Sequence, residues 1–598
     1  MEFRDGPRWL PAMAAALAVV MMGCIGGGLC LSDYYPQVFV DWSFSYKTVS
    51  PLGFTQQVIA INDQFPGPVI TATTNDVLIV NVLNKLDEDL LVSWDGIFMR
   101  HNSWEAGVLG TNCPIPPGRN FTYEFQLKDQ IGSYFYFPSI NFQRAAGGYG
   151  AMIVNNRSVV PLPFDLPYGD FSIMIGDWYN RDHKALRAAL DAGEGLGIPD
   201  GVLINGKGPY QYDTTLVPGG IDFSTFDVVP GKTYRIRVHN VGTLTSLNFR
   251  IQNHNLLLVE TEGQYTMQQN YSSFDIHVGQ SYSFLVTMDQ DASTDYYIVA
   301  SARFVNSTLW ERVSGVAVLH YSNSQGKATG PLPDAPNDQY DQAWSLRQAL
   351  SVRENNSASG ARPNPQGSFH YGTINVTAVY AFQSLPPTVI NGKLRSTLNG
   401  ISFVNPDVPI RLADVHGVQG EYELDFPSYP LSGSPRTDRS MINGTYKSFA
   451  EIILVNNDTV VQSFHLDGFC FYVVGMGFGV WTNESRSQYN KWDAICRSTV
   501  QVFPGAWTAV FVYLDNEGAW NIRTENLDRW YLGRETYIRI INPETNKTEF
   551  APPVDVRYCG PLAYLQKDPP LSNASTTQNR KLLFTMLIAL LAAIFSLH

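Results

Sequence analysis

Histidine, cysteine and the acidic residues are the side chains that most often do chemistry, and here they form no hydrolase or nucleotide-binding motif. The sequence has no Gly-x-Ser-x-Gly elbow and no Cys/His nucleophile pair with local support. Gly147-Gly148-Tyr149-Gly150 lacks the strand-to-helix context of a phosphate loop. Most histidines are scattered without metal-ligand spacing, and we expect them on the surface or in loops: His101, His183, His239, His254, His277, His320, His370 and His416.

Length and composition narrow the class of protein. A chain of 598 residues predicts three or four domains. Aromatic residues make up 13% and charged residues 16%, which is typical of a β-rich globular protein. The net charge of -13 and the absence of a basic cluster argue against nucleic acid as a partner.

The N-terminus has the pattern of a signal peptide, which we place at residues 1–31. Arg4 and Arg8 precede an apolar run from Leu10 to Cys24, and small residues follow it. Cleavage is expected between Gly26 and Ser32. The alternative is a signal anchor that stays in the membrane.

The C-terminal residues 566–598 resemble a spacer followed by a glycosylphosphatidylinositol (GPI) attachment signal. An apolar tail from Leu582 to Leu597 follows a polar stretch, and small residues lie upstream of it. Ser572 and Asn573 are the attachment candidates. A C-terminal transmembrane anchor is the alternative, and both interpretations leave the rest of the chain outside the cell.

Glycosylation sequons and cysteines independently favour secretion. The eleven Asn-x-Ser/Thr sequons are at Asn120, Asn156, Asn270, Asn306, Asn355, Asn375, Asn443, Asn457, Asn483, Asn546 and Asn573. After loss of Cys24 and Cys30, an even number of cysteines remains, which suits two disulfides: Cys113, Cys470, Cys496 and Cys559. Their spacing leaves all three pairings open.

The hydrophobic pattern predicts an all-β chain of short strands, for example over residues 77–82, 233–238 and 509–514. The clearest helix candidate runs from Asp182 to Ala192.

Two short units recur three times in order and indicate three copies of one fold. The first unit occurs as Ile61-Asn62-Asp63, Ile204-Asn205-Gly206 and Ile390-Asn391-Gly392. The second is a turn before an alternating strand, at Pro117-Gly118, Val278-Gly279 and Pro504-Gly505. We therefore predict domains at residues 32–162, 163–325 and 368–565. Residues 326–367 are expected to form an exposed, partly flexible linker.

Several motifs, in this order, resemble the plant ascorbate oxidase and laccase family. They are Trp94-x-Gly96, Trp104, Cys113-Pro-Ile-Pro-Pro-Gly118, Gln143-Arg144-x-x-Gly147-x-Tyr149-Gly150 and His465-Leu-x-Gly468. The resemblance runs from about Asp33 to Gly560 and implies three cupredoxin-like β-sandwich (Greek-key) domains. It also implies disulfides between Cys113 and Cys559 and between Cys470 and Cys496.

Oxidases of that family hold one blue copper through two His, a Cys thiolate and a weak axial ligand, and three more coppers through four His-x-His pairs. Imidazole and thiolate suit copper, whereas carboxylate and hydroxyl compete poorly for it. The corresponding positions here are Ser93, Asp95, Phe137, Ser139, Gln462, His465, Asp467, Arg523, Thr524, Glu525, Arg529 and Arg534. Only His465 is an imidazole, and Thr524 stands where the thiolate would be. We therefore expect no four-copper oxidase activity and no catalytic residue, with His465 as the candidate metal ligand.

This combination of a kept scaffold and changed ligands is similar to a plant branch of the family. These are the monocopper-oxidase-like proteins similar to the skewed-root-growth protein, with pollen-expressed ascorbate-oxidase-like proteins as close relatives. The resemblance implies an extracellular protein linked to directional growth and wall expansion.

If the family fold is kept, a charged cluster forms between the first and third domains, from Asp95, His465, Asp467, Arg523 and Glu525. The leading interpretation is a buried salt-bridge network, and no cofactor is then expected. The alternatives are a site for one Ca²⁺, Mn²⁺ or Zn²⁺ ion, or a single copper held through His465.

Three functional hypotheses follow. The leading one is a non-catalytic or weakly active protein on the outer plasma membrane and in the cell wall, which binds a wall polymer or an extracellular protein. The second is a monocopper oxidoreductase of unknown substrate. The third is a divalent-metal or carbohydrate-binding module.

Overall fold

The structure, a computed structural model, describes residues 35–210, 223–305, 313–336, 342–358, 374–543 and 551–567. The chain divides into two compact units, residues 1–557 and residues 558–598. In the second unit the structure describes a 3-10 helix, Gly560–Leu565. The expected signal peptide and anchor signal lie outside the described residues, as do Ser572 and the sequons at Asn306, Asn546 and Asn573. Across the described ranges, no helix has the length and apolar character needed to cross a membrane.

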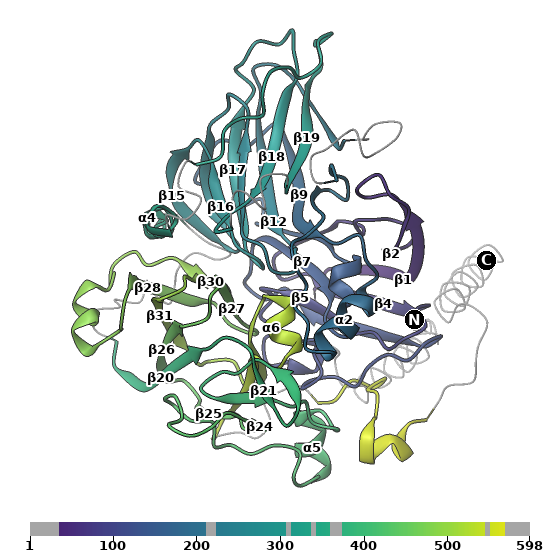
Figure 1. Ribbon diagram of the computed structural model, residues 1–598, viewed down its shortest axis with the longest axis vertical. Coiled ribbons are helices and arrows are strands. Elements are labelled where there is room, and N and C mark those ends of the chain that lie inside the picture. Colours follow the sequence, from purple (N-terminus) through teal and green to yellow (C-terminus); the bar gives the residue numbers. More distant parts are fainter. Residues whose placement is uncertain are drawn as a thin grey trace, which may run out of the picture. The chain divides into compact units, whose positions relative to one another are not determined.

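Three β-sandwiches make up the first unit, so the predicted fold class is confirmed (Figure 1). The first sandwich pairs a sheet of order β2-β1-β4-β6 with one of order β3-β8-β7-β5. Its strands are β1 (Gln37–Val49), β2 (Gln56–Ile61), β3 (Ile70–Thr73), β4 (Val77–Asn84), β5 (Val92–Asp95), β6 (Asn120–Gln126), β7 (Gly132–Pro138) and β8 (Gly150–Asn155).

The second sandwich has sheets of order β10-β9-β12-β17-β14-β15 and β11-β19-β18-β13-β16. Its strands are β9 (Gly169–Trp178), β10 (Gly201–Ile204), β11 (Thr225–Val228), β12 (Thr233–Asn240), β13 (Leu247–Ile251), β14 (Leu256–Thr261), β15 (Gln264–Tyr271), β16 (Phe274–Ile276), β17 (Ser281–Thr287), β18 (Tyr296–Ala302) and β19 (Ser314–Tyr321).

The third sandwich has sheets of order β20-β26-β31-β28-β29 and β25-β33-β32-β27-β30, with the small pairs β21-β22 and β23-β24. The first sheet contains β20 (Val376–Ser384), β26 (Phe449–Asn456), β28 (Phe471–Phe478), β29 (Cys496–Arg497) and β31 (Ala506–Tyr513). The second contains β25 (Ile442–Thr445), β27 (Gln462–Leu466), β30 (Thr499–Val502), β32 (Gly518–Thr524) and β33 (Glu535–Ile541). The small pairs are β21 (Thr388–Ile390), β22 (Lys393–Arg395), β23 (Ile401–Phe403) and β24 (Arg436–Asp438).

The repeated sequence units are turns of the same kind in all three sandwiches. In each Ile-Asn-Asp/Gly unit the two residues after Ile have positive φ, as at Asn205 (47°) and Gly206 (83°). Two successive positive φ angles are the signature of a tight hairpin turn, for which Asn-Gly is the preferred sequence. Gly118, Gly279 and Gly505 of the second unit also have positive φ, at 74°, 82° and 67°.

The main helices are α2 (His183–Asp191), α4 (Gln342–Ser351), α5 (Ile410–His416) and α6 (Leu527–Tyr531). Helix α2 confirms the predicted helix, and the side chain of Asp182 caps its first turn by accepting from the Lys184 backbone N–H at 2.8 Å. Helix α4 lies within residues 326–367, where the sequence predicted an exposed, partly flexible linker. This part of the segment is packed, because Leu346 is buried and Gln348 accepts from the Asp275 backbone N–H at 2.8 Å.

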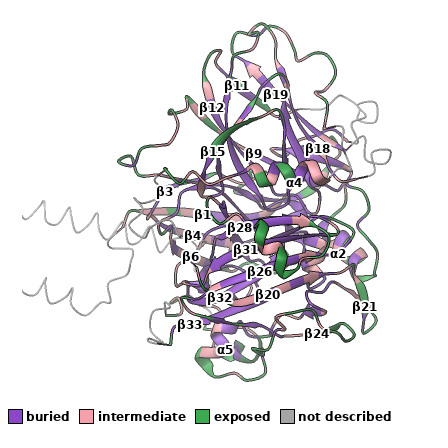
Figure 2. Cartoon of the chain, turned by 90° about the vertical axis from the view of Figure 1, so that its left-hand side faces the viewer, coloured by how far each residue is buried: buried purple, intermediate pink, exposed green. Residues whose placement is uncertain are grey.

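Buried residues follow the strands, and exposed residues gather in the loops (Figure 2). One apolar cluster lies where the first and third sandwiches meet. It includes Phe135 and Phe137 of β7, Trp530 of α6 and Tyr537 of β33. The charged residues that the sequence singled out lie beside this interface.

Candidate functional site

Strand periodicity places the site residues on two faces of one sheet. Strands β27 and β32 are antiparallel, with His465 opposite Arg523 and Phe464 opposite Thr524. Because successive side chains point to opposite faces, His465 and Arg523 lie on one face, while Gln462 and Thr524 lie on the other. Two separate polar clusters result.

The first cluster joins the first and third sandwiches through a chain of buried ion pairs. Asp467 Oδ1 lies 2.9 Å from His465 Nε2 and 2.9 Å from Arg523 Nη1. Arg523 Nε donates to Glu525 Oε1 at 2.8 Å, and Arg144 Nη1 donates to Glu525 Oε2 at 2.5 Å. Arg144 Nη2 also donates to the Glu525 backbone carbonyl.

Asp95 of β5 lies at the edge of this cluster. Its Oδ2 is 3.6 Å from His465 Nδ1, whose hydrogen-bond partner is Thr499 Oγ1 at 2.8 Å. Within the described ranges, Asp95 Oδ2 has no hydrogen-bond partner. The predicted convergence of Asp95, His465, Asp467, Arg523 and Glu525 is therefore seen in the structure.

The electrostatics of the cluster balance internally. Burial raises the pKa of Glu525, but Arg523 and Arg144 outweigh it and hold that pKa at about 2. Burial lowers the pKa of His465, but Asp95 and Asp467 outweigh it and raise the pKa. Burial raises the pKa of Asp95 well above its ordinary value. Three carboxyl groups therefore face two guanidinium groups and one imidazole that is biased toward its charged form.

Aromatic rings cover the guanidinium groups. Arg144 lies over the Phe137 ring at 4.8 Å from its centroid, and Arg523 lies over the Trp530 ring at 4.6 Å. Arginine stacks on aromatic faces and can form hydrogen bonds from its edge at the same time. Phe137 thus stands at a metal-ligand position of the family and packs against a cation.

Two of the singled-out positions, Ser93 and Ser139, join neither cluster. Ser139 Oγ donates to the Gly107 carbonyl at 2.6 Å. Ser93 is buried on β5, and its Oγ has no hydrogen-bond partner in the part of the chain that the structure describes.

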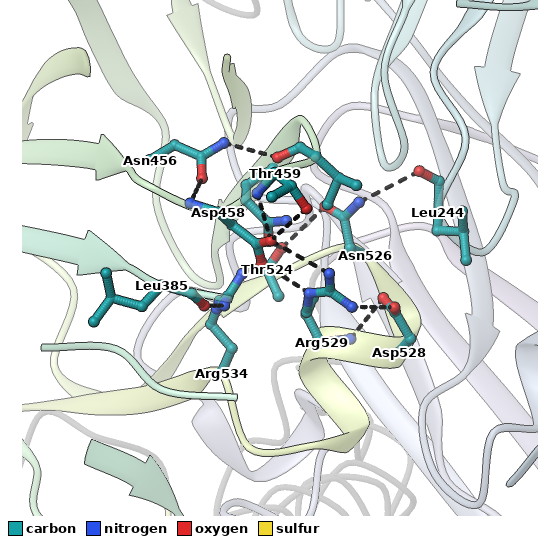
Figure 3. A network of polar contacts seen from close by, with 12 residues as sticks. Leu244, Leu385, Asn456, Asp458, Thr459, Thr524, Asn526, Asp528, Arg529 and Arg534 are labelled. Atoms are coloured by element: carbon teal, nitrogen blue, oxygen red, sulfur yellow. Dashed lines mark hydrogen bonds and ion pairs between the residues drawn. The ribbon is translucent and has the colours of Figure 1, made fainter. Parts of the chain in front are cut away.

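The second cluster collects the remaining positions around Asp458 (Figure 3). Thr524 Oγ1 donates to Gln462 Oε1 at 2.9 Å. Asp458 Oδ2 accepts from Arg529 Nε at 2.8 Å and from Arg534 Nη1 at 2.8 Å. Gln462, Thr524, Arg529 and Arg534 correspond to the blue-copper site of the family. Here Gln462 pairs with Thr524, and Arg529 and Arg534 share Asp458.

Neither cluster fits copper. A ring nitrogen of His465, an Asp95 oxygen and a Glu525 oxygen lie within 4.8 Å of one another, which is close enough for a three-ligand metal site. However, both ring nitrogens of His465 and both carboxylate oxygens of Glu525 already have partners in the protein. The set also has one imidazole and no thiolate, the ligands that copper prefers.

Sequence comparison identifies the class of protein. Multicopper oxidase family profiles match residues 43–159, 169–324 and 406–546. The chain therefore belongs to the multicopper oxidase family.

Its high-identity relatives within that family are monocopper oxidase-like proteins. Monocopper oxidase-like protein SKS1 of Arabidopsis thaliana is 64% identical over 94% of this chain and 95% of its own length. Monocopper oxidase-like protein SKU5 of the same plant is 63% identical over 90% of this chain and 92% of its own length. Among solved structures, the multicopper oxidase Fet3p matches with a TM-score of 0.72 and 19% identity over 86% of this chain and 93% of its own, which bears on the fold alone.

The cysteines and sequons occupy positions that suit their expected roles. Cys470 and Cys496 form a disulfide, as predicted, and Cys113 and Cys559 are disulfide-bonded as well. All described sequon asparagines are exposed or half-buried: Asn120, Asn156, Asn270, Asn355, Asn375, Asn443, Asn457 and Asn483.

Four of the scattered histidines are buried: His183, His239, His254 and His277. His254 and His277 lie in loops as expected, whereas His239 on β12 and His183 at the start of α2 are neither in loops nor on the surface. Burial lowers the pKa of His239 and of His277 to about 3. One ring nitrogen of each lies near a serine hydroxyl, so these neutral rings pack as core side chains.

Sequence reasoning missed two residues that complete the clusters. Arg144 was noted only as part of a family motif, although a lone buried arginine beside a changed metal site is a signal for a carboxylate partner. Asp458 had no local signal, because its partners Arg529 and Arg534 are 71 and 76 residues away.

Proposed function

We propose that this chain is an extracellular, GPI-anchored glycoprotein of the multicopper oxidase family that acts without four-copper oxidase chemistry. The observation that supports this proposal most directly is the chain of ion pairs Asp467–Arg523–Glu525–Arg144. Side chains of the protein itself occupy the donors and acceptors at positions that hold copper in the family's oxidases. A ligand set already paired in this way binds a cation only if those pairs break.

Its role is that of a binding or structural protein in plant cell-wall expansion and directional growth. The accessible sequons and the C-terminal attachment signal support a place on the outer face of the plasma membrane and in the wall. The partner is a wall polymer or an extracellular protein.

Oxygen uptake tests the loss of oxidase chemistry. The full-length protein is equilibrated with copper and supplied with ascorbate or a phenol, beside a four-copper oxidase as the positive control. The expected result is no uptake above buffer. Steady turnover that a chelator stops, and that is absent in His465→Ala, would contradict the proposal.

Enzymatic release tests the anchor. Phosphatidylinositol-specific phospholipase C is expected to free the protein from membranes. Retention after treatment would favour a transmembrane anchor.

A second candidate is binding of one divalent cation at Asp95, His465 and Glu525. The observation in its favour is the close approach of these residues together with the unpartnered Asp95 Oδ2. Calorimetric titration with Mn²⁺, Zn²⁺ and Ca²⁺ tests it. Saturable binding that Asp95→Asn removes would support it, whereas no heat of binding would exclude it.

A further inference from the structure

A cavity of about 340 Å³ lies between the first and third sandwiches, lined by residues 108–109 and 139–142 of one and residues 395–405 and 527–537 of the other. It adjoins the charged cluster through Trp530 but contains none of its ionised groups. A volume of this size accommodates a small ligand of one or two rings.

Aromatic side chains form much of its wall, including Phe142, Phe403, Trp530 and Tyr531. The Trp530 ring is fixed in place, because its one face packs on Arg523 and its Nε1 donates to Glu535 Oε2 at 2.9 Å. Walls of this kind favour a flat, rigid ring, which gains stacking contacts and loses little conformational entropy on binding.

One acceptor in the lining is unused. Asn405 Oδ1 is buried and has no hydrogen-bond partner among the described residues. A buried amide oxygen without a donor is unfavourable, so a ligand that supplies an N–H or O–H at this point is favoured. Nearby Glu535 is buried, and burial raises its pKa.

The lining of the cavity also includes a positively charged side chain, that of Arg395. Arg395 of β22 is half-buried, and its guanidinium makes no hydrogen bond or ion pair within the described ranges. The neighbouring acid Asp191 is exposed and accepts a hydrogen bond from Tyr531 Oη at 2.8 Å. A free guanidinium beside an apolar cavity suits a carboxylate, which it can bind with two parallel hydrogen bonds.

We propose that this cavity binds a planar aromatic carboxylate with a hydrogen-bond donor on its ring. The ring lies against the aromatic wall, the carboxylate pairs with Arg395, and the donor reaches Asn405 Oδ1. The proposal does not depend on whether the chain binds copper.

Isothermal titration calorimetry of the full-length protein with three matched probes tests each contact. Indole-3-acetate has the ring, the carboxylate and an N–H donor. Indole-3-ethanol lacks the carboxylate, and 1-methylindole-3-acetate lacks the donor. We expect saturable binding of indole-3-acetate and binding about tenfold weaker for each of the other two, since charge-assisted and buried hydrogen bonds contribute this much.

Variants locate the binding. Arg395→Gln is expected to weaken indole-3-acetate binding to the level of indole-3-ethanol and to leave indole-3-ethanol binding unchanged. Lys393→Gln is the matched control, because it removes one positive charge from the same strand at an exposed position outside the cavity. Val404→Trp fills the cavity and is expected to abolish binding of all three probes, with circular dichroism to verify the fold.

Three results would overturn the proposal. One is the absence of saturable binding of indole-3-acetate at millimolar concentration. Another is equal affinity for the three probes. The third is binding that Arg395→Gln and Val404→Trp both leave unchanged.

Discussion

Arg523 is the residue that connects the charges of the cluster. It pairs with Asp467 on one side and with Glu525 on the other, and its guanidinium lies over Trp530. Burial opposes its charge, but Asp467 and Glu525 outweigh this effect and raise the pKa of Arg523. A lysine at this position would lack the flat fork that serves two carboxylates at once.

Replacement of Arg523 by methionine is expected to cost about 3–5 kcal/mol in the free energy of unfolding, because two buried carboxylates lose their shared partner. Denaturant unfolding measures this cost. Arg100→Met is the control, because Arg100 and its partner Asp515 are 29% and 31% exposed, and such pairs contribute about 1 kcal/mol or less. Equal losses in the two variants would mean that Arg523 is not a buried electrostatic connection.

Glu354 gives a prediction for pH. Burial is the larger cause and the negative charge of Asp493 the smaller one that together raise the pKa of Glu354 from 4.5 to about 7. The folded state therefore holds this proton more tightly than the unfolded state, so the contribution of Glu354 to stability is fully present below pH 4.5 and is lost as the pH rises to 7.

Glu354→Gln is expected to flatten this dependence and to stabilise the protein above pH 7 by roughly 2–3 kcal/mol. Melting temperatures measured across that range are the readout. The control Asp493→Asn removes only the smaller of the two causes and should flatten the profile less. If the melting temperature of Glu354→Gln depended on pH as in the wild type, the raised pKa of Glu354 would be contradicted.

The positions of these charges were only partly predictable. The convergence of His465, Asp467, Arg523 and Glu525 was predicted from the resemblance to the family. In the structure they lie on β27 and β32 or directly after them, and strand periodicity puts them on one face. The rest could not be predicted, since Arg144 meets Glu525 across 381 residues and only the packing of two domains brings them together.

At the scale of elements, the segment from β32 through α6 to β33 contributes residues to both clusters. Asp458 follows β26 and holds Arg529 in α6 and Arg534 just before β33. One carboxylate therefore fixes both ends of a short connection.

Asp458→Asn is expected to loosen this connection, because the buried guanidinium of Arg534 and the half-buried guanidinium of Arg529 lose their anion. Hydrogen exchange measured by mass spectrometry should be faster in residues 526–534 and unchanged in β31. Asp528→Asn is the matched control, since Asp528 contacts only Arg529 of the two arginines. Unchanged exchange in residues 526–534 would exclude Asp458 as the fixing group.

Elements with strong local signals were predicted correctly. The turns at Gly118, Gly279 and Gly505 and the capped helix α2 are determined by nearby residues. The Ile-Asn-Asp/Gly units were recognised only as repeats, and the structure shows that they are tight turns. Helix α4 was missed because its surroundings are rich in Ser, Asn, Pro and Gly, while its stability comes from tertiary packing. Leu346 joins the apolar cluster of the first and third sandwiches, and Gln348 accepts from the Asp275 backbone N–H of the second.

At the scale of the whole molecule, the first sandwich contributes Asp95 and Arg144 to a cluster otherwise built by the third, and Arg144 is the one that forms an ion pair with Glu525. The two sandwiches also share an apolar interface. We expect them to unfold together in a calorimetric scan.

Arg144→Met is expected to separate that unfolding into two transitions, because Glu525 loses the partner that ties it to the first sandwich. Arg303→Met is the control, since it breaks a buried ion pair with Asp275 inside the second sandwich alone. A single transition in Arg144→Met at a lower temperature would mean that the apolar interface suffices to couple the domains.

The three-sandwich architecture was predictable because its repeats and turns recur along the chain. The domain boundaries remain predictions, as do the attachment residue and the partner. The shared core of the first and third sandwiches was not predictable, because it is made by residues hundreds of positions apart.

Elemental analysis tests the central claim most directly. The purified, glycosylated protein is equilibrated with copper, freed of loosely bound metal and assayed for metal content. Ion pairs in place of copper ligands predict far less than one metal ion per chain. One tightly held copper per chain, lost in His465→Ala, would contradict this account and establish a monocopper site.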